Sequence, residues 1–237
     1  MELPFFYINE YTAGQKTITL HEDTSRHMIQ VLRMKKGDKL HLADGKGNLL
    51  TTHITDDHKK HCQVEVEDSV FTAASPHKIS IGISLLKNTN RFEWFLEKAT
   101  EIGITEIIPL LCEHTVKEKF RYERLQQICI SAMLQSQQVW LPVLHQPLPF
   151  ALLFRLSEIP GWENKFIAHC EETDHKLPLS TYQPIKQSTI LLIGPEGDFS
   201  SAEIQLSLAH KFVPVSLGRT RLRTETAGVV AATLLGI

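Results

Sequence analysis

The sequence predicts an α/β protein, in which a mostly parallel sheet with helices on both faces follows a small β-barrel-like domain. The first observation is the alternation of apolar and polar residues before residue 72, which is typical of half-buried strands. The second is a succession of β-branched runs and amphipathic helical stretches from residue 78 onward. The third is the small, polar stretch FTAASPHK at 71–78, which favours a linker between the two parts.

The N-terminal part is expected to be mostly strands with one helix. Three alternating stretches predict the strands: TITL at 17–20, DKLHLADGKGNLLTTHITD at 38–56 with a hairpin turn at 44–47, and HCQVEVEDSVF at 61–71. Between the first two, the spacing of Met28, Val31 and Leu32 predicts a short amphipathic helix. We expect this helix to end at Gly37.

The C-terminal part alternates between strands and helices, as a parallel sheet requires. The predicted strands are 78–86, 106–111, 142–146, 165–170, 189–194 and 213–218. The predicted helices are 90–103, stopped by Gly103, then 122–138, 149–159, one that begins after Ser200 and one that begins near Thr224.

The composition is that of an ordinary globular chain, with 42% hydrophobic and 22% charged residues among 237. A formal net charge of -2 offers no global attraction for nucleic acid, so an RNA site has to come from local clusters of cations. The cysteines Cys62, Cys112, Cys129 and Cys170 show no C-x-x-C spacing, so neither a zinc knuckle nor a redox pair is indicated, and we expect no metal.

The N-terminal stretch MELPFFYINE lacks the basic and apolar regions of a signal peptide. No apolar run approaches the roughly 20 residues that span a bilayer. We therefore expect a cytoplasmic protein without a membrane segment.

The turn GPEGDFS at 194–200 follows a predicted buried strand, where open parallel sheets bind ligands. Gly197 allows a ligand to approach the backbone closely, and Ser200 with Glu203 forms a capping box for the next helix. The turn matches no phosphate-binding motif, and its two carboxylates favour a cationic or polar ligand. Taken alone, the stretch fits a structural turn as well as a ligand loop.

The last stretch, VPVSLGRTRLRTETAGVVAATLLGI, runs from a strand into a nearly all-apolar helix. Arg219, Arg221 and Arg223 alternate between them, which indicates an anion or nucleic-acid contact or, alternatively, a solvated basic loop. A helix that is apolar on all sides has to be buried, and a second subunit is one way to bury it.

Four ordered motifs together resemble the SPOUT methyltransferases, most closely the family that methylates N3 of a uridine in 16S ribosomal RNA. They are HMIQVLRMKKGD, LLKNTNRFEWFLEKATEIGITEIIPL, GPEGDFS and LGRTRLRTETA. The resemblance spans nearly the whole chain.

The resemblance implies a PUA-like, RNA-binding β-barrel at 1–72 and a SPOUT domain at 78–237, in which a deep trefoil knot holds S-adenosylmethionine at a homodimer interface. The implied cofactor residues lie on two loops and their flanks: Leu192, Ile193, Gly194, Pro195, Glu196, Gly197, Leu217, Gly218, Leu222 and Thr226. The stretch AHCEE at 168–172, which matches the motif poorly, is expected to help line the adenosine.

The sequence departs from the family pattern at three places. Asp198 stands where a second glycine is usual, and Thr220-Arg221 replaces Arg-Ile. Gln138 stands where an arginine is expected. These departures concern the details of the target more than the reaction class.

Methyl transfer from a sulfonium is an in-line displacement that depends on positioning, and uracil N3 must lose its proton as it attacks. Arg223 is the expected catalytic cation, which holds a phosphate or a uracil oxygen as negative charge develops. Glu225 is a candidate base, or else a carboxylate that stabilises a helix start. Because N3 is hidden in a base pair, we expect the target base to be flipped out.

The expected RNA contacts are cations, each of which could equally be a solvated surface charge: Arg33, Lys35, Lys36, Lys87, Arg91, Arg219 and Arg221. The implied partner is 16S ribosomal RNA within the small subunit. Three rival functions remain: a catalytically silent RNA-binding protein on the same fold, a methyltransferase with another RNA target, and a small-molecule enzyme that uses the same pocket. A small-molecule enzyme predicts no salt-sensitive RNA affinity, whereas phosphate contacts would make RNA affinity fall steeply as the salt concentration rises.

Overall fold

The computed structural model describes residues 3–116, 120–156, 161–171 and 176–236. They form two compact units. The first comprises the residues up to Ala74 together with Met133–Leu141, and the second comprises Ser75–Ala132 and Pro142–Ile237. The change of unit after Ala74 lies within the predicted linker at 71–78. The predicted division places Met133–Leu141 in the second domain, whereas the structure groups it with the first.

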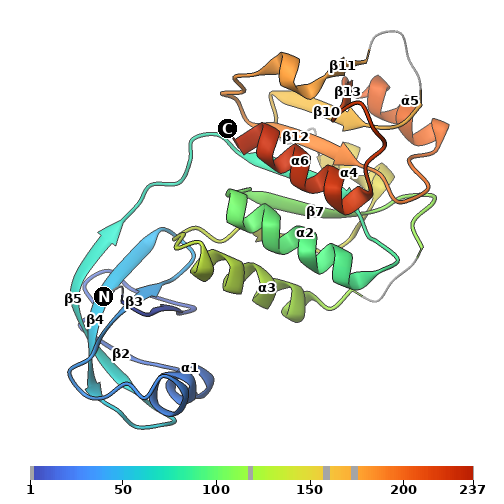
Figure 1. Ribbon diagram of the computed structural model, residues 1–237. Coiled ribbons are helices and arrows are strands. Elements are labelled where there is room, and N and C mark those ends of the chain that lie inside the picture. The colour runs from blue at the N-terminus through green and yellow to red at the C-terminus, as the bar shows by residue number, and fades with distance from the viewer. Residues whose placement is uncertain (1–2, 117–119, 157–160, 172–175, 237) are drawn as a thin grey trace. The chain divides into compact units, whose positions relative to one another are not determined.

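The first unit is built on a five-stranded sheet (Figure 1). Its elements are β1 (Phe5–Tyr7), β2 (Thr17–Thr19), α1 (Glu22–Arg26), the helical turn η1 (His27–Val31), β3 (Lys39–Ala43), β4 (Asn48–Asp56) and β5 (Gln63–Phe71). The strand order is β1-β3-β4-β5-β2, with β1 parallel to β3 and the other pairs antiparallel. The predicted hairpin is confirmed, and the Asp44 carboxylate holds its turn by accepting the N–H groups of Lys46 and Asn48. The sequence does not predict β1, because three residues are too few to show a period.

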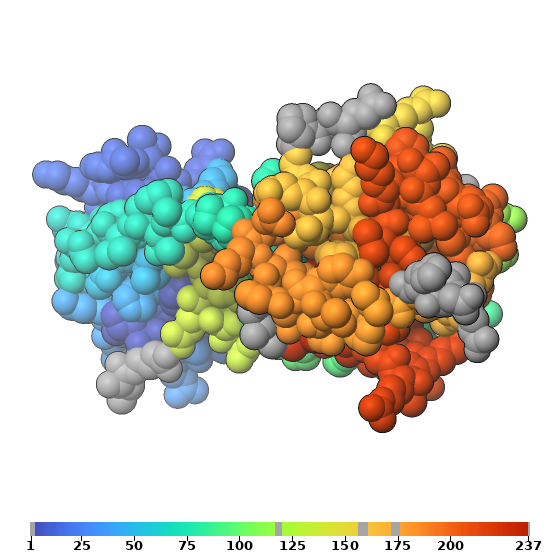
Figure 2. Space-filling model, turned by 90° about the horizontal axis from the view of Figure 1, so that it is seen from above, coloured from blue at the N-terminus to red at the C-terminus, as the bar shows by residue number. Residues whose placement is uncertain are grey.

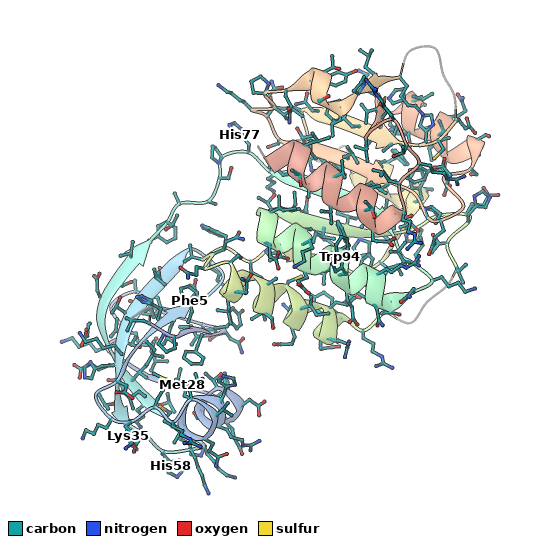
Figure 3. All side chains as sticks on the ribbon, in the orientation of Figure 1. Phe5, Met28, Lys35, His58, His77 and Trp94 are labelled. Atoms are coloured by element: carbon teal, nitrogen blue, oxygen red, sulfur yellow. The ribbon has the colours of Figure 1, made fainter. Side chains whose placement is uncertain are left out.

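The helix of the first unit ends earlier than the sequence predicts. It continues from α1 through η1 and stops at Val31, because Arg33 adopts a left-handed conformation with φ of 57°. Gly37, the predicted stop, has φ of 92° in the turn that follows. Met28 is fully buried within this unit, whereas the Lys35 side chain is exposed and projects outward (Figure 3).

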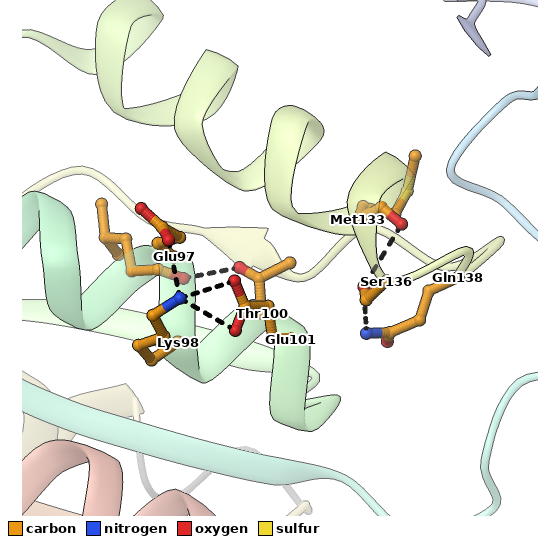
Figure 4. Close-up of polar contacts among 8 residues, drawn as sticks. Glu97, Lys98, Thr100, Glu101, Met133, Ser136 and Gln138 are labelled. Atoms are coloured by element: carbon orange, nitrogen blue, oxygen red, sulfur yellow. Dashed lines mark hydrogen bonds and ion pairs between the residues drawn. The ribbon is translucent and has the colours of Figure 1, made fainter. Parts of the chain in front are cut away.

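A segment from much later in the chain completes the first unit. Leu141 donates its N–H to Gly45 O at 3.0 Å, and Trp140 Nε1 donates to Thr72 O at 2.9 Å. A Cβ atom at Gly47 would come within 2.7 Å of the Trp140 ring, so the hairpin turn needs glycine to accept this segment. Gln138, one of the departures noted above, lies here and donates to Ser136 Oγ at 2.8 Å (Figure 4).

The second unit is an eight-stranded sheet flanked by helices (Figure 1). Its strands are β6 (Ile79–Ser84), β7 (Glu106–Leu111), β8 (Val143–Leu144), β9 (Leu148–Pro149), β10 (Asn164–Ala168), β11 (Leu177–Pro178), β12 (Thr189–Ile193) and β13 (Val213–Ser216). Its helices are α2 (Thr89–Ile102), α3 (Tyr122–Gln135), which runs on into the first unit, α4 (Phe150–Leu156), the 3₁₀ turn η2 (Leu179–Tyr182), α5 (Ser201–Ala209) and α6 (Thr224–Gly236). The order is β11-β13-β10-β12-β6-β7-β8, with β9 beside β7, and all pairs are parallel.

The helices cover both faces of this sheet because alternate strand residues face opposite layers. Ile190 and Leu192 of β12 belong to one apolar cluster with Phe150 of α4 and Ile204 of α5. On the other face, α6 packs against α2 and the neighbouring strands (Figure 1). The predicted α/β fold, with a parallel sheet preceded by a small β-rich part, is confirmed, and the trefoil knot stays a prediction.

The predicted end of α2 at Gly103 is confirmed, and the helix begins one residue earlier than predicted, at Thr89. Asn88 caps its start by accepting the N–H of Asn90, and Gly103 ends it with φ of 92°. On its surface, Lys98 Nζ donates to the carboxylates of Glu97 and Glu101 (Figure 4). Every helix among the described residues is too short or too polar to cross a bilayer.

Candidate functional site

A cavity of about 700 Å³ lies at the carboxyl ends of three adjacent strands of the second unit. The strands end level with one another, since Ala168 of β10 pairs with Ile193 of β12 and with Val215 of β13. The walls are the segments that follow these strands, together with Lys176 and the first turn of α6. In Figure 2 the yellow-orange surface around β10 adjoins the red-orange surface of the C-terminal segment.

The turn after β12 is shaped by close approaches of its backbone. A Cβ atom at Gly194 would lie 2.9 Å from the Phe199 nitrogen, and one at Gly197 would lie 3.2 Å from His114 Cβ. Asp198 has φ of 67°, and its N–H donates to Pro195 O at 2.9 Å. The predicted capping box is confirmed, because Ser200 and Glu203 bond each other's backbone N–H groups.

The segment after β10 supplies a buried imidazole. His169 is 7% exposed, and neither ring nitrogen has a hydrogen-bond partner among the described residues. Burial lowers the pKa of the His169 imidazole, and the nearby Lys176 ammonium lowers it further. Asp198 and Glu171 act in the opposite direction, but the net shift is downward. A neutral ring offers a ligand one N–H donor and one acceptor.

The segment after β13 brings cations to the same cavity. Arg219, Arg221 and Arg223 are all exposed, and all three line it. Thr224 and Ala227 of α6 complete this wall. The cavity thus combines apolar strand ends, uncharged polar groups and guanidinium groups that can hold a carboxylate or a phosphate.

A second cavity, of about 520 Å³, is lined by residues 87–91 and Glu196. Glu196 also lines the first cavity, and its Oε1 accepts the Lys87 N–H at 3.3 Å. Arg91 Nε lies 3.6 Å from Glu225 Oε1. The Glu225 side chain is 8% exposed, and its Oε2 has no hydrogen-bond partner among the described residues.

Most of the predicted site residues come together in the second unit. Ten line the first cavity: Ile193, Gly194, Pro195, Glu196, Leu217, Gly218, Arg219, Arg221, Leu222 and Arg223. Lys87 and Arg91 line the second cavity. Four others do not appear in the lining of either cavity: Leu192, Gly197, Glu225 and Thr226. The cations Arg33, Lys35 and Lys36 are exposed on the first unit.

Several lining residues were not predicted from the sequence. Val215 and Ser216 end β13, so the rule that ligands bind at strand ends could have identified them. Lys176 has no such signal, because it comes near the cavity only through the tertiary fold. Of the stretch 168–172, Ala168, His169 and Cys170 line the cavity, and Glu172 lies outside the described residues.

The cysteines are not arranged for metal binding. No group of three or more potential metal ligands gathers in the described part of the chain. Burial raises the pKa of Cys62 and Cys129 to about 11 and that of Cys112 to about 12, so these thiols stay protonated. Cys170 is exposed, but burial of its sulfur and the Asp198 carboxylate also raise its pKa.

Two family models match the chain, one over each part. The model of an RNA methyltransferase domain matches residues 73–236. The model of an RNA methyltransferase PUA domain matches residues 20–67.

Individual proteins are similar over nearly the full length. "Ribosomal RNA small subunit methyltransferase E" of Synechocystis is 32% identical over 225 residues, which cover 92% of this chain and 72% of that protein. The structure of a probable rRNA-methyltransferase from Porphyromonas gingivalis matches with a TM-score of 0.87 and 37% identity, covering 97% of this chain and 95% of that one. A ribosomal RNA small subunit methyltransferase E from Neisseria gonorrhoeae, bound to S-adenosyl methionine, matches with a TM-score of 0.85 and 27% identity, covering 98% and 95%.

Proposed function

The chain belongs to the RNA methyltransferase family that carries a PUA domain, and from this premise we propose that it methylates N3 of a uridine in 16S ribosomal RNA, with S-adenosylmethionine as the methyl donor. The substrate is the RNA of the small ribosomal subunit. Relatives named for methylation of small-subunit ribosomal RNA support the choice of substrate. The motif resemblance supports the choice of N3.

The observation that carries the proposal is the cavity at the ends of β10, β12 and β13. Its volume of about 700 Å³ lies within the range of about 300–1,000 Å³ that is typical of small-molecule sites. Gly194 leaves no side chain between the ligand and the backbone, and His169 offers a nucleoside two ring nitrogens that no other described residue bonds. The arginines suit a carboxylate, and Glu196 suits a cationic group. These residues fit S-adenosylmethionine, which supplies an electrophilic methyl group.

Arg223 is the proposed catalytic cation. Its exposed side chain lines the cavity, where it can hold a uracil oxygen or a neighbouring phosphate while negative charge builds up on the base. Of the two roles considered for Glu225, its burial and its pairing with Arg91 favour the structural one. The carboxylate lies in the first turn of α6, where the helix dipole stabilises it.

The RNA is proposed to contact both units. Lys87 and Arg91 lie beside Glu196, which borders the first cavity, so they are suited to hold the strand next to the reacting base. Arg33, Lys35 and Lys36 form a second cluster of exposed cations, on the first unit. The family resemblance further implies a cytoplasmic homodimer with a trefoil knot, in which α6 meets the partner subunit.

The test is methyl transfer from labelled S-adenosylmethionine to small ribosomal subunits and to free ribosomal RNA, with the nucleoside identified by mass spectrometry. We expect 3-methyluridine, and the better substrate tells whether the assembled subunit is required. Cofactor binding without methyl transfer to either substrate would agree with the assigned fold and would contradict the proposed RNA target. RNA binding without cofactor binding would favour a silent RNA-binding protein.

A further inference from the structure

We propose that Asp198 is a positioning residue for the cofactor cavity, because its carboxylate fastens the segment after β10 to the turn after β12. These two segments follow adjacent strands, and both line the same cavity. The role as a cofactor-positioning residue rests on the proposed function, whereas the fastening itself does not.

The backbone at Asp198 favours a glycine. Its φ of 67° lies in the left-handed region, which L-residues adopt at a cost and asparagine or aspartate tolerate better than most. The family pattern that the turn resembles has glycine at this position. The side chain of Asp198 therefore needs a compensating interaction.

The carboxylate makes that interaction with two backbone N–H groups. Its Oδ1 accepts from Phe199 N at 2.8 Å, within the same turn. Its Oδ2 accepts from Cys170 N at 2.6 Å, in the segment that follows β10. Hydrogen bonds to an ionised acceptor are short and about twice as strong as neutral ones. A glycine could make neither bond.

Lys176 holds the same segment from its carbonyl side. Its Nζ donates to His169 O at 2.6 Å and to Glu171 O at 2.9 Å. The backbone of three consecutive residues, 169–171, is thus held by two charged side chains that also line the cavity. The peptide unit that joins His169 to Cys170 is thus bonded on both sides, and neither nitrogen of the His169 ring has a partner among the described residues. Asp198 and Lys176 therefore fix the wall that carries the one buried imidazole of the described cavity lining.

The decisive variant is Asp198→Gly, because glycine adopts φ of 67° without strain while it removes the carboxylate and its two side-chain bonds. We expect its Kd for S-adenosylhomocysteine, the demethylated product, to rise about 10-fold in calorimetry, as loss of a charge-assisted bond implies. The Cys170 amide should exchange with deuterium at least about 10-fold faster, because it loses its acceptor. Since the chemistry itself is untouched, kcat at saturating S-adenosylmethionine should stay within about 2-fold while KM rises. Asp198→Asn, with a neutral acceptor, should fall between wild type and glycine.

Lys211→Gly is the matched control. Lys211 also has a left-handed backbone, with φ of 65°, but it is exposed and outside both cavities. The variant Lys211→Gly shows the effect of glycine at a left-handed position whose side chain does not join two segments of the cavity. Its Kd for S-adenosylhomocysteine and its Cys170 amide exchange should therefore match those of the wild type.

Wild-type affinity and wild-type Cys170 exchange in Asp198→Gly would overturn the inference and leave the proposed function intact. Faster exchange with unchanged affinity would overturn the positioning role. If the wild-type chain binds no S-adenosylhomocysteine, both the proposed function and the positioning role are overturned. The exchange rate of the Cys170 amide in Asp198→Gly would then still show whether the Asp198 carboxylate holds that amide.

Discussion

Gly228 of α6 lies directly against the ring of Phe95 on α2. A Cβ atom at position 228 would come within 2.5 Å of Phe95 Cδ2 and within 3.1 Å of Ile83 Cδ1 of the sheet. Phe95 is fully buried, so its ring has no solvent to move into. The close packing of these two helices on the sheet therefore depends on the missing side chain.

Gly228→Ala should destabilise the protein even though alanine is the better helix former. The gain in helix propensity is about 1 kcal/mol, whereas overpacking of a buried contact costs about 1–3 kcal/mol. With so short an approach we expect a net loss of about 1 kcal/mol in the free energy of unfolding, measured with urea and circular dichroism. In a Phe95→Leu background the same substitution should cost less, since the smaller side chain leaves room. Equal costs in the two backgrounds would contradict this explanation.

Glu106 lies at the start of β7, at the end of the sheet away from the cavity, where it bonds side chains from other segments. Glu106→Gln should weaken these contacts. The carboxylate accepts from Ser80 Oγ at 2.5 Å and from His145 Nε2 at 2.8 Å, and Trp162 Nε1 donates to the same Ser80 hydroxyl. We expect a loss of about 2 kcal/mol at pH 7, because a largely buried charged acceptor is replaced by a neutral amide. The control Glu97→Gln removes an exposed pair with Lys98 and should cost less than about 1 kcal/mol.

The stabilisation from Glu106 should depend on pH in a defined direction. Burial alone would raise the pKa of Glu106, but the hydrogen bonds from His145 and Ser80 outweigh it and hold the pKa below its usual value of 4.5. The contribution is therefore present above pH 4.5 and is lost as the pH falls through the lowered pKa. The stability difference between wild type and Glu106→Gln should shrink in urea titrations below that pH. A constant difference from about pH 7 to about pH 3.5 would argue against the assignment.

His169 should make the wild type sensitive to mild acid. Its pKa lies below its usual value of 6.5, so the unfolded chain binds more protons near that pH than the folded one. Stability should consequently fall as the pH drops through 6.5, and His169→Gln, which cannot titrate there, should remove this part of the loss. Lys176, Asp198 and Glu171 face the ring and stay in both proteins. The comparison is made by thermal unfolding from pH 7.5 to 5.5, and parallel curves would show that His169 does not contribute.

Arg223→Ala should lower turnover more than cofactor affinity. The guanidinium is proposed to act on charge that develops in the transition state, and loss of one such donor costs about 10²–10³ in kcat. We expect the Kd for S-adenosylhomocysteine to change less than about 5-fold. The matched control is Arg155→Ala on α4, which removes an exposed positive charge outside both cavities and should leave both quantities near wild type. An equal loss of turnover and affinity in Arg223→Ala would sink the catalytic role.

Local patterns were sufficient to predict most elements of the second unit. Apolar residues on one face and Gly103 at the end predict the helix α2. Five consecutive apolar or β-branched residues predict the strand β12. Short elements were not predicted, because β1, β9 and β11 have two or three residues and show no periodicity. The early stop of the first helix also escaped, since the left-handed conformation of Arg33 has no sequence signal of its own.

For the site, the strand-end rule and the motif resemblance pointed to the turn at 194–199 and the arginine-rich segment. Both lie on the cavity, because parallel strands bring their carboxyl ends to one edge of a sheet. The expectation that the stretch 168–172 helps to line the site agrees with Ala168, His169 and Cys170, which line the cavity. Lys176 could not be inferred in this way, because it reaches the cavity through contacts between segments that are far apart in sequence from the turn.

The sequence by itself determined the periodic elements, the glycines that the turns need and the family to which the motifs point, because each depends on residues close together in the chain. Only the tertiary structure decided that Asp198 bonds Cys170, that Glu225 is buried beside Arg91, and that Met133–Leu141 belongs with the first unit. The physical reason is that such contacts depend on how strands and helices pack against one another. Packing is a property of the whole fold, which no local window of sequence contains.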